Sequence, residues 1–248
     1  MKTISFMAAV IFAASGCVYS EPPAGYQLVW SDEFNGTTLD LNKWHYRTGE
    51  KLESAQKPEN VSVSDGLLRI ALKKEKSGKA HYTAGGVISR QSFKYGYYEA
   101  RFRCPKGAGW HTSFWTSAGK AQEIDICEQD SANNRSYSAG VIDWSGKSGK
   151  KLFGFGRKHF RSPREAVPDF AADFHVWGCE FTPSSVTFYL DGKVTHHTDA
   201  TKFPHGDHNV WLTCLGALWG DPVKPKHIDD SKLPAYADFD WVRIYTKP

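Results

Sequence analysis

An acidic stretch at residues 122–129 constrains the fold of this chain more than any other segment. It reads Gln-Glu-Ile-Asp-Ile-Cys-Glu-Gln and holds three carboxylates within six residues. Alternate side chains of a β-strand point to opposite faces, so Glu123 and Asp125 share one face and the isoleucines take the other. Glu128 is out of phase by one position, and a one-residue β-bulge at Ile126-Cys127 would return it to the acidic face. The stretch therefore predicts a bulged strand with one apolar face and one acidic face.

The rest of the chain also has the pattern of an all-β protein. In residues 97–104 the side chains of Tyr98, Ala100, Phe102 and Cys104 fall on one face, which is a clear two-residue period. Asp-Gly pairs at 65–66 and 191–192 separate alternating runs and predict tight hairpin turns. Helical periodicity is nearly absent. The sequence predicts a sandwich of two antiparallel sheets in a single domain.

Three like charges on one face of a strand oppose folding, which leaves two interpretations of the acidic face. The structural one is a solvated outer surface. The chemical one is a carboxylate pair that flanks a glycosidic bond, where one group attacks the sugar and the other protonates the leaving oxygen. Glu123 and Glu128 would stand about four strand steps of ~3.3 Å apart, and their side chains could lean together on a concave sheet.

The motif Glu-Ile-Asp-Ile-Cys-Glu resembles the Glu-x-Asp-x-x-Glu signature of glycoside hydrolase family 16. The resemblance is to the bulge-containing branch, which includes laminarinases, agarases, porphyranases and κ-carrageenases, and it extends over about residues 26–245. It implies a concanavalin A-like jelly roll with a concave substrate cleft. It also implies a retaining endo-β-glycosidase in which Glu123 is the nucleophile, Asp125 its helper and Glu128 the general acid/base.

The polysaccharide substrate stays open between two classes. Family frequency favours a β-1,3- or mixed-linkage glucan. Two departures favour a red-algal galactan such as agarose, porphyran or carrageenan: the His-Thr-Ser-Phe-Trp sequence at 111–115, and Asp143, which stands where many members carry a histidine. Transglycosylation is an alternative to hydrolysis. A non-catalytic carbohydrate-binding protein on the same fold is the alternative from another functional class.

Several further residues are candidates for the site. The proposed substrate-binding residues, for which core packing or ion pairing is the alternative, are Trp110, Trp115, Arg90, Trp144, Asp143 and Trp219. The resemblance also implies a structural Ca²⁺ on the convex face, with matching positions at Glu33, Gly66 and Asp240. We expect no other cofactor.

The N-terminal residues have the features of an export signal. Lys2 precedes a short apolar run, and residues 1–20 end in small residues. Residues 14–17 resemble a bacterial lipobox, which would make Cys17 a lipidated N-terminus, although ordinary cleavage after Ser20 also fits. Residues 21–25 are then a short tether, and residues 26–248 form the catalytic domain. We expect an exported protein, either secreted or anchored as a periplasmic or cell-surface lipoprotein.

Charge and cysteine content limit the partners. The net charge is +4 with scattered basic residues, so nucleic acid is not an expected ligand. A polysaccharide is the expected partner, with no protein partner and a monomeric state. Cys104, Cys127, Cys179 and Cys214 could form disulfides in three pairings or remain buried thiols.

Overall fold

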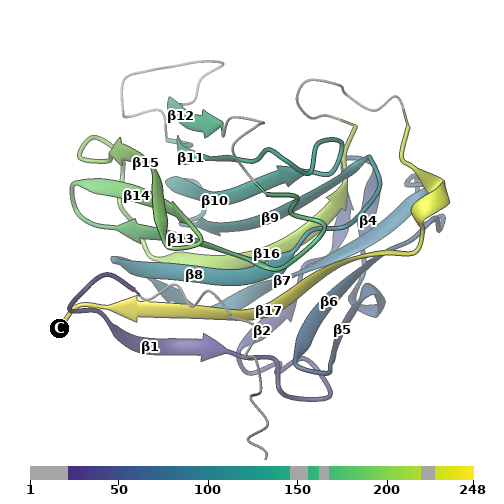
Figure 1. The fold of residues 1–248 in the computed structure, drawn as a ribbon, viewed down its shortest axis with the longest axis horizontal. Coiled ribbons are helices and arrows are strands. Elements are labelled where there is room, and N and C mark those ends of the chain that lie inside the picture. The colour runs from purple at the N-terminus through teal and green to yellow at the C-terminus, as the bar shows by residue number, and fades with distance from the viewer. Residues whose placement is uncertain (1–21, 146–155, 162–167, 219–226) are drawn as a thin grey trace, which may run out of the picture.

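The computed structural model describes residues 22–145, 156–161, 168–218 and 227–248. Two stacked β-sheets contain all the strands of this part of the chain (Figure 1), which confirms the predicted sandwich. The export signal, Cys17 and Trp219 lie outside the described residues. Within them, no helix has the length and apolar character needed to cross a membrane.

The first sheet has eight strands in the order β15-β14-β13-β8-β17-β6-β5, with β1 beside β17. Its strands are β1 (Gln27–Asp32), β5 (Val61–Ser64), β6 (Leu67–Leu72), β8 (Gly96–Arg103), β13 (His175–Phe181), β14 (Ser185–Leu190), β15 (Lys193–Asp199) and β17 (Ala235–Thr246). The C-terminal strand β17 thus lies between strands from the first half of the chain (Figure 1).

The second sheet has nine strands in the order β12-β11-β10-β9-β16-β7-β4-β3, with β2 beside β7. Its strands are β2 (Trp44–Tyr46), β3 (Gly49–Lys51), β4 (Ser54–Gln56), β7 (Tyr82–Phe93), β9 (Trp110–Ser117), β10 (Gln122–Asp130), β11 (Ser138–Asp143), β12 (Gly156–Arg161) and β16 (His208–Gly216). Two 3₁₀ helices, η1 (Pro58–Asn60) and η2 (Asp230–Lys232), complete the elements. The antiparallel prediction fails at one pair, because β4 and β7 run parallel.

The two Asp-Gly hairpins form where the sequence predicts them. Asp65 and Gly66 between β5 and β6 have φ angles of 54° and 73°, and Asp191 and Gly192 between β14 and β15 have 50° and 75°. Type I′ turns need positive φ at both central residues, and their twist matches that of the flanking strands. Asp191 also fixes the hairpin to β13, because its carboxylate accepts from the backbone N–H of Val176 at 2.9 Å.

The inner faces of the two sheets enclose one apolar core. Phe102 on β8 stacks on Trp177 of β13 with ring centroids 4.0 Å apart, and Phe114 and Ile124 from the other sheet belong to the same buried cluster. All four cysteines in the described domain are free thiols and are buried. Of the two alternatives left open by the sequence, disulfides and buried thiols, the structure has buried thiols.

Candidate active site

The acidic stretch forms β10, and the predicted bulge is present. Against β9, the register runs from Asp125 opposite Trp115 to Cys127 opposite Phe114, so Ile126 is the extra residue. Glu123 opposes Ser117 and Glu128 opposes Ser113 in the same pairing. Directly opposed residues share a face, so all three carboxylates lie on the face turned away from the core, while Ile124, Ile126 and Cys127 are buried in the core. We call this outer surface of the nine-stranded sheet the carboxylate face.

Strand β9 supplies a second row of side chains to the carboxylate face. Two-residue alternation places His111, Ser113, Trp115 and Ser117 there, each opposite a residue of the acidic row. His111 opposes Asp130, which extends the row of acids by one residue beyond the predicted motif. The two glutamates stand opposite serines that are four residues apart, in agreement with the spacing expected from the sequence.

Trp144 contacts the nucleophile candidate. Its indole Nε1 donates to Oε2 of Glu123 at 3.0 Å, and its backbone N–H donates to the carbonyl oxygen of Ala121. A hydrogen bond to a charged acceptor holds the acceptor in place and stabilises its charge. Trp144 is 36% exposed, so part of the residue reaches solvent. The structure therefore places Trp144 beside Glu123, as expected for a substrate-contacting residue.

His111 bridges two carboxylates. Its Nδ1 lies 2.6 Å from Oδ1 of Asp130, and its Nε2 lies 3.4 Å from Oε1 of Glu128. The side chain is only 8% exposed. Burial lowers the pKa of His111, but hydrogen bonds with Asp130 and Glu128 outweigh burial and raise it to about 9. At neutral pH a cationic imidazolium therefore stands next to Glu128.

An aromatic pair with a cation above it lies beside the acidic row. Trp115 stacks on Trp211 of β16, with centroids 4.4 Å apart and planes inclined by 26°. The guanidinium carbon of Arg47 lies 6.0 Å from the ring centroid of Trp115 and 5.6 Å from that of Trp211. Burial lowers the pKa of Arg47 and attraction to Glu123 opposes that shift, so arginine keeps its charge here. Trp115 thus lies beside the acidic row, and its role in substrate binding stays a prediction.

Two predicted substrate-binding residues face the core instead. Trp110 is 1% exposed and packs edge-on against Tyr82, because an even position on β9 points away from the acidic row. Asp143 is fully buried and opposes Gln122, which shares the core-facing side with Ile124. Its Oδ1 accepts from the backbone N–H and the hydroxyl of Ser145. The predictions for Trp110 and Asp143 are therefore corrected, since neither side chain lies on the carboxylate face.

Arg90 is exposed, and its side chain forms hydrogen bonds with the neighbouring loop. Its Nε donates to the carbonyl oxygens of Leu41 at 2.6 Å and Trp44 at 3.1 Å. These bonds fasten the segment that leads into β2. A substrate role for Arg90 stays a prediction, as does the one for Trp219.

The two carboxylates that the resemblance matched to a calcium site form ion pairs with arginines. Both oxygens of Glu33 accept from Arg243, at 2.9 and 2.8 Å, and Asp240 pairs with Arg101. Gly66 contributes the turn of the first hairpin. A hard cation needs several oxygen ligands, and here the two carboxylates already serve guanidinium groups. The described residues at these positions therefore do not fit a calcium ion in this arrangement.

A two-sheet β-sandwich that carries a bulged Glu-x-Asp-x-x-Glu strand beside stacked aromatic rings belongs to the class of glycoside hydrolases. Residues 27–247 match the family described as β-porphyranase A-D, glycoside hydrolase family 16 domain. The chain therefore belongs to glycoside hydrolase family 16, and it is an endo-acting, retaining enzyme. The resemblance drawn from the motif is confirmed.

Relatives with different substrates match at similar identity. A β-glucanase of Rhodothermus marinus is 26% identical over 99% of this chain and 94% of its own length. β-Porphyranase E of Zobellia galactanivorans is 30% identical over 90% of each chain. Glucan endo-1,3-β-glucosidase A1 of Niallia circulans is 30% identical over 90% of this chain, which spans only 38% of that longer protein.

Solved structures support the fold. A non-specific endo-β-1,3(4)-glucanase of family 16 superposes with a TM-score of 0.81 at 24% identity, covering 92% of this chain and 94% of the other. The laminarinase catalytic domain of Thermotoga petrophila gives 0.75 at 23% identity, covering 90% and 98%.

Sequence reasoning missed His111, Arg47 and Trp211. His111 could have been found by extending the alternation of Trp115 backwards along β9, since it falls on the same face. Trp211 is brought opposite Trp115 by the pairing of β16 with β9, a long-range contact. Arg47 comes directly after the short strand β2, and no local pattern marks it.

Proposed function

We propose that the chain hydrolyses internal β-linkages of a sulfated red-algal galactan of the porphyran type. The observation that carries the proposal is the Arg47 guanidinium above Trp115 and Trp211. Stacked indoles provide flat apolar faces for a sugar ring, and a guanidinium beside them provides the donor geometry that a sulfate ester requires. Within the described part of the chain, Arg47 forms no salt bridge, so its charge is available to a ligand. The sequence alone favoured a glucan, but a neutral glucan gives this cation no counter-charge.

The proposed chemistry uses the acidic row in two steps. Glu128 donates a proton to the glycosidic oxygen while the Glu123 carboxylate attacks the anomeric carbon, which releases one chain end and leaves a glycosyl ester on Glu123. Glu128 then takes a proton from water, whose oxygen attacks the same carbon and frees Glu123. Asp125 lies between the two on the same face, where as a like charge it favours retention of a proton in the row. A sugar hydroxyl in place of water would give transglycosylation.

The test compares kcat/KM on porphyran, agarose, κ-carrageenan, laminarin and lichenan. We expect the highest value on porphyran and a loss of at least ~10³-fold on it with Glu123→Gln. Arg47→Gln should lower kcat/KM on porphyran by roughly 10- to 100-fold, the range of one charge-assisted hydrogen bond. Lys193→Gln is the charge-matched control, because this exposed lysine lies on β15 of the other sheet, and we expect it to leave substrate preference unchanged.

Three outcomes would redirect the proposal. Greater activity on laminarin or lichenan than on porphyran would assign the chain to the β-glucanases. An unchanged kcat/KM on porphyran in Arg47→Gln would show that Arg47 does not contact a sulfate ester of the substrate. Binding of porphyran without release of any reducing ends would support the non-catalytic alternative.

We also propose that the protein is exported and acts as a monomer on polysaccharide outside the cytoplasm, with lipid on Cys17 as its only membrane attachment. The supporting observations are the apolar run and the lipobox-like residues 14–17. Mass spectrometry of the mature N-terminus in a bacterial host tests this proposal. A diacylglyceryl group on Cys17 supports anchoring, whereas an unmodified N-terminus at Glu21 would show ordinary cleavage.

A further inference from the structure

On the outer face of the eight-stranded sheet, two arginines from neighbouring strands share one carboxylate. Asp238 of β17 opposes Arg69 of β6 on one side and Arg103 of β8 on the other. Its Oδ1 accepts from Arg69 Nε at 2.7 Å, and its Oδ2 accepts from an Arg103 Nη at 2.8 Å. Asp238 is 2% exposed, whereas both guanidinium groups reach solvent. Because each guanidinium carries five N–H donors, several remain for a ligand.

Other ion pairs on this sheet are balanced. Arg101 pairs with Asp240 and Arg243 pairs with Glu33, one cation to one carboxylate. The Arg69–Asp238–Arg103 group keeps an excess positive charge. One-to-one ion pairs would be enough to stabilise the outer face of the sheet, so the second arginine of this group is not needed for that purpose.

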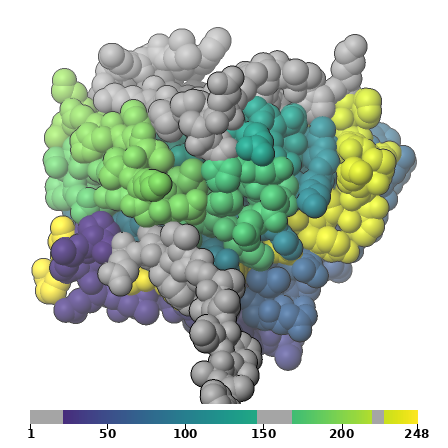
Figure 2. Space-filling model, in the orientation of Figure 1, coloured from purple at the N-terminus to yellow at the C-terminus, as the bar shows by residue number. Residues whose placement is uncertain are grey.

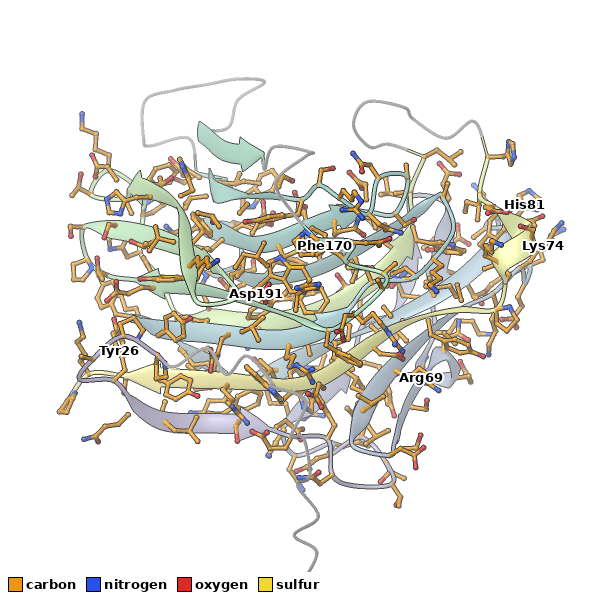
Figure 3. The ribbon with its side chains drawn as sticks, in the orientation of Figure 1. Tyr26, Arg69, Lys74, His81, Phe170 and Asp191 are labelled. Carbon is orange, nitrogen blue, oxygen red and sulfur yellow. The ribbon has the colours of Figure 1, made fainter. Side chains whose placement is uncertain are left out.

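A surface pocket of about 400 Å³ opens beside this group. Lys106 and Lys232 line it together with both arginines, and Asp238 is the single carboxylate among the described lining residues. Four cations against one acid leave three net positive charges. In Figure 2 the yellow surface formed by η2 and the start of β17 borders the blue surface of β6, and Figure 3 marks Arg69 on that strand.

An exposed aromatic ring completes the pocket. Tyr236 is 41% exposed, and the guanidinium carbon of Arg69 lies 5.0 Å from its ring centroid. Of the two acids at the adjacent η2, Asp230 pairs with Lys74, whereas Asp229 accepts from Ser231 and offsets part of the charge of Lys232. Cations beside an open aromatic ring suit a sulfated sugar, which presents both an anion and an apolar ring face.

We propose that this pocket is a second binding site, which holds a sulfated segment of a polysaccharide chain. It lies on the sheet opposite to the one that carries Glu123, so a chain bound there does not occupy the carboxylate face. The volume is within the range of small-ligand pockets, which accommodates a short segment of a sugar chain. The identity of the polymer rests on the proposed function, whereas the charge of the ligand rests on the pocket alone. The site would keep the enzyme on the polymer between cleavage events.

The test is affinity electrophoresis of full-length Glu123→Gln protein in gels that contain porphyran, with neutral agarose gels in parallel. Lys106→Gln/Lys232→Gln removes two charges and leaves the buried Asp238 with both arginines. We expect this double variant to bind porphyran roughly tenfold more weakly, with no change on agarose. Lys193→Gln/Lys202→Gln, at exposed lysines on and after β15, is the charge-matched control and should bind as the parent does.

Equal porphyran binding by the two double variants would overturn the proposal, as would an equal loss on neutral agarose. Loss of all porphyran binding in Arg47→Gln would also overturn it, because the carboxylate face would then be the whole binding surface. In a protein with intact Glu123, the Lys106→Gln/Lys232→Gln variant should keep kcat/KM on short soluble oligosaccharides. In a further outcome, porphyran binds in a manner that depends on the two lysines and yet is not hydrolysed. That result would support the second binding site and contradict the proposed function.

Discussion

Nε2 of His111 lies 3.4 Å from Oε1 of Glu128, while Nδ1 of the same ring lies 2.6 Å from Asp130. The ring therefore joins the proposed acid/base to a further acid on the same strand. Asp130 holds one nitrogen, which fixes the orientation of the other toward Glu128. We regard His111 as a positioning residue, since it acts through Glu128.

Replacing His111 with glutamine is expected to lower kcat by about 100-fold, because Glu128 loses the partner that orients it. The cationic imidazolium opposes protonation of Glu128, so its removal should also move the alkaline limb of the pH–rate profile to higher pH. The measurement is kcat over pH 5–10. His197→Gln on β15 is the control, because this histidine lies in the eight-stranded sheet, where its Nδ1 is 3.0 Å from the hydroxyl oxygen of Thr187. An unchanged pH profile with a lowered melting temperature would reduce His111 to a structural role.

Trp144→Phe keeps an aromatic ring but removes the N–H that donates to Glu123. Hydrogen bonds to charged groups contribute ~1.5–3 kcal/mol, so we expect kcat to fall by roughly 10- to 100-fold. Trp110→Phe is the matched control, since its indole lies in the core. That variant should lower the free energy of unfolding and leave kcat unchanged. A comparable loss of kcat in both variants would contradict the assigned geometry.

His208 makes stability depend on pH in the acid range. The side chain is fully buried, and its Nε2 lies 3.0 Å from Oε1 of Gln122. Burial lowers the pKa of His208 to about 4. The unfolded chain, with a histidine pKa near ~6.5, binds this proton first, so stability is complete above that value and is lost as pH falls from 6.5 to 4. The loss is about 3 kcal/mol.

Urea unfolding at pH 7.0, 5.5 and 4.5 checks this expectation. His208→Gln should be less stable than the parent at pH 7, and the difference between the two should shrink as pH falls. A constant difference would show that His208 does not carry the effect. His111 does not interfere, because its raised pKa keeps its contribution constant below pH 6.5.

The four core cysteines should behave as inert thiols. Burial raises the pKa of Cys104 and Cys127 well above the usual value, so little thiolate forms. In a Cys17→Ser protein we expect no reaction with a thiol reagent in the native state and four thiols after unfolding without reductant. The melting temperature should be the same with and without dithiothreitol. Fewer than four thiols in the unfolded protein would reveal a disulfide.

The sequence by itself determined the architecture and the acidic row. Alternation and the Asp-Gly turns depend on contacts between near neighbours in the chain, so they can be read locally. The bulge followed from the phase of Glu128 against Glu123 and Asp125 on a single strand. Trp115 was placed beside the row through the family resemblance of the segment that precedes the acidic strand.

Tertiary structure decided what surrounds the row. Trp110 was assigned to the site from its proximity in sequence and Asp143 from the family resemblance, but the strand register turned both toward the core. Arg47 and Trp211 meet over Trp115 only because β2 and β16 flank β7 and β9, respectively, in one sheet. The Arg69–Asp238–Arg103 group joins strands from both ends of the chain. Such contacts depend on which strands pair and in which register, and no local pattern in the sequence specifies those choices.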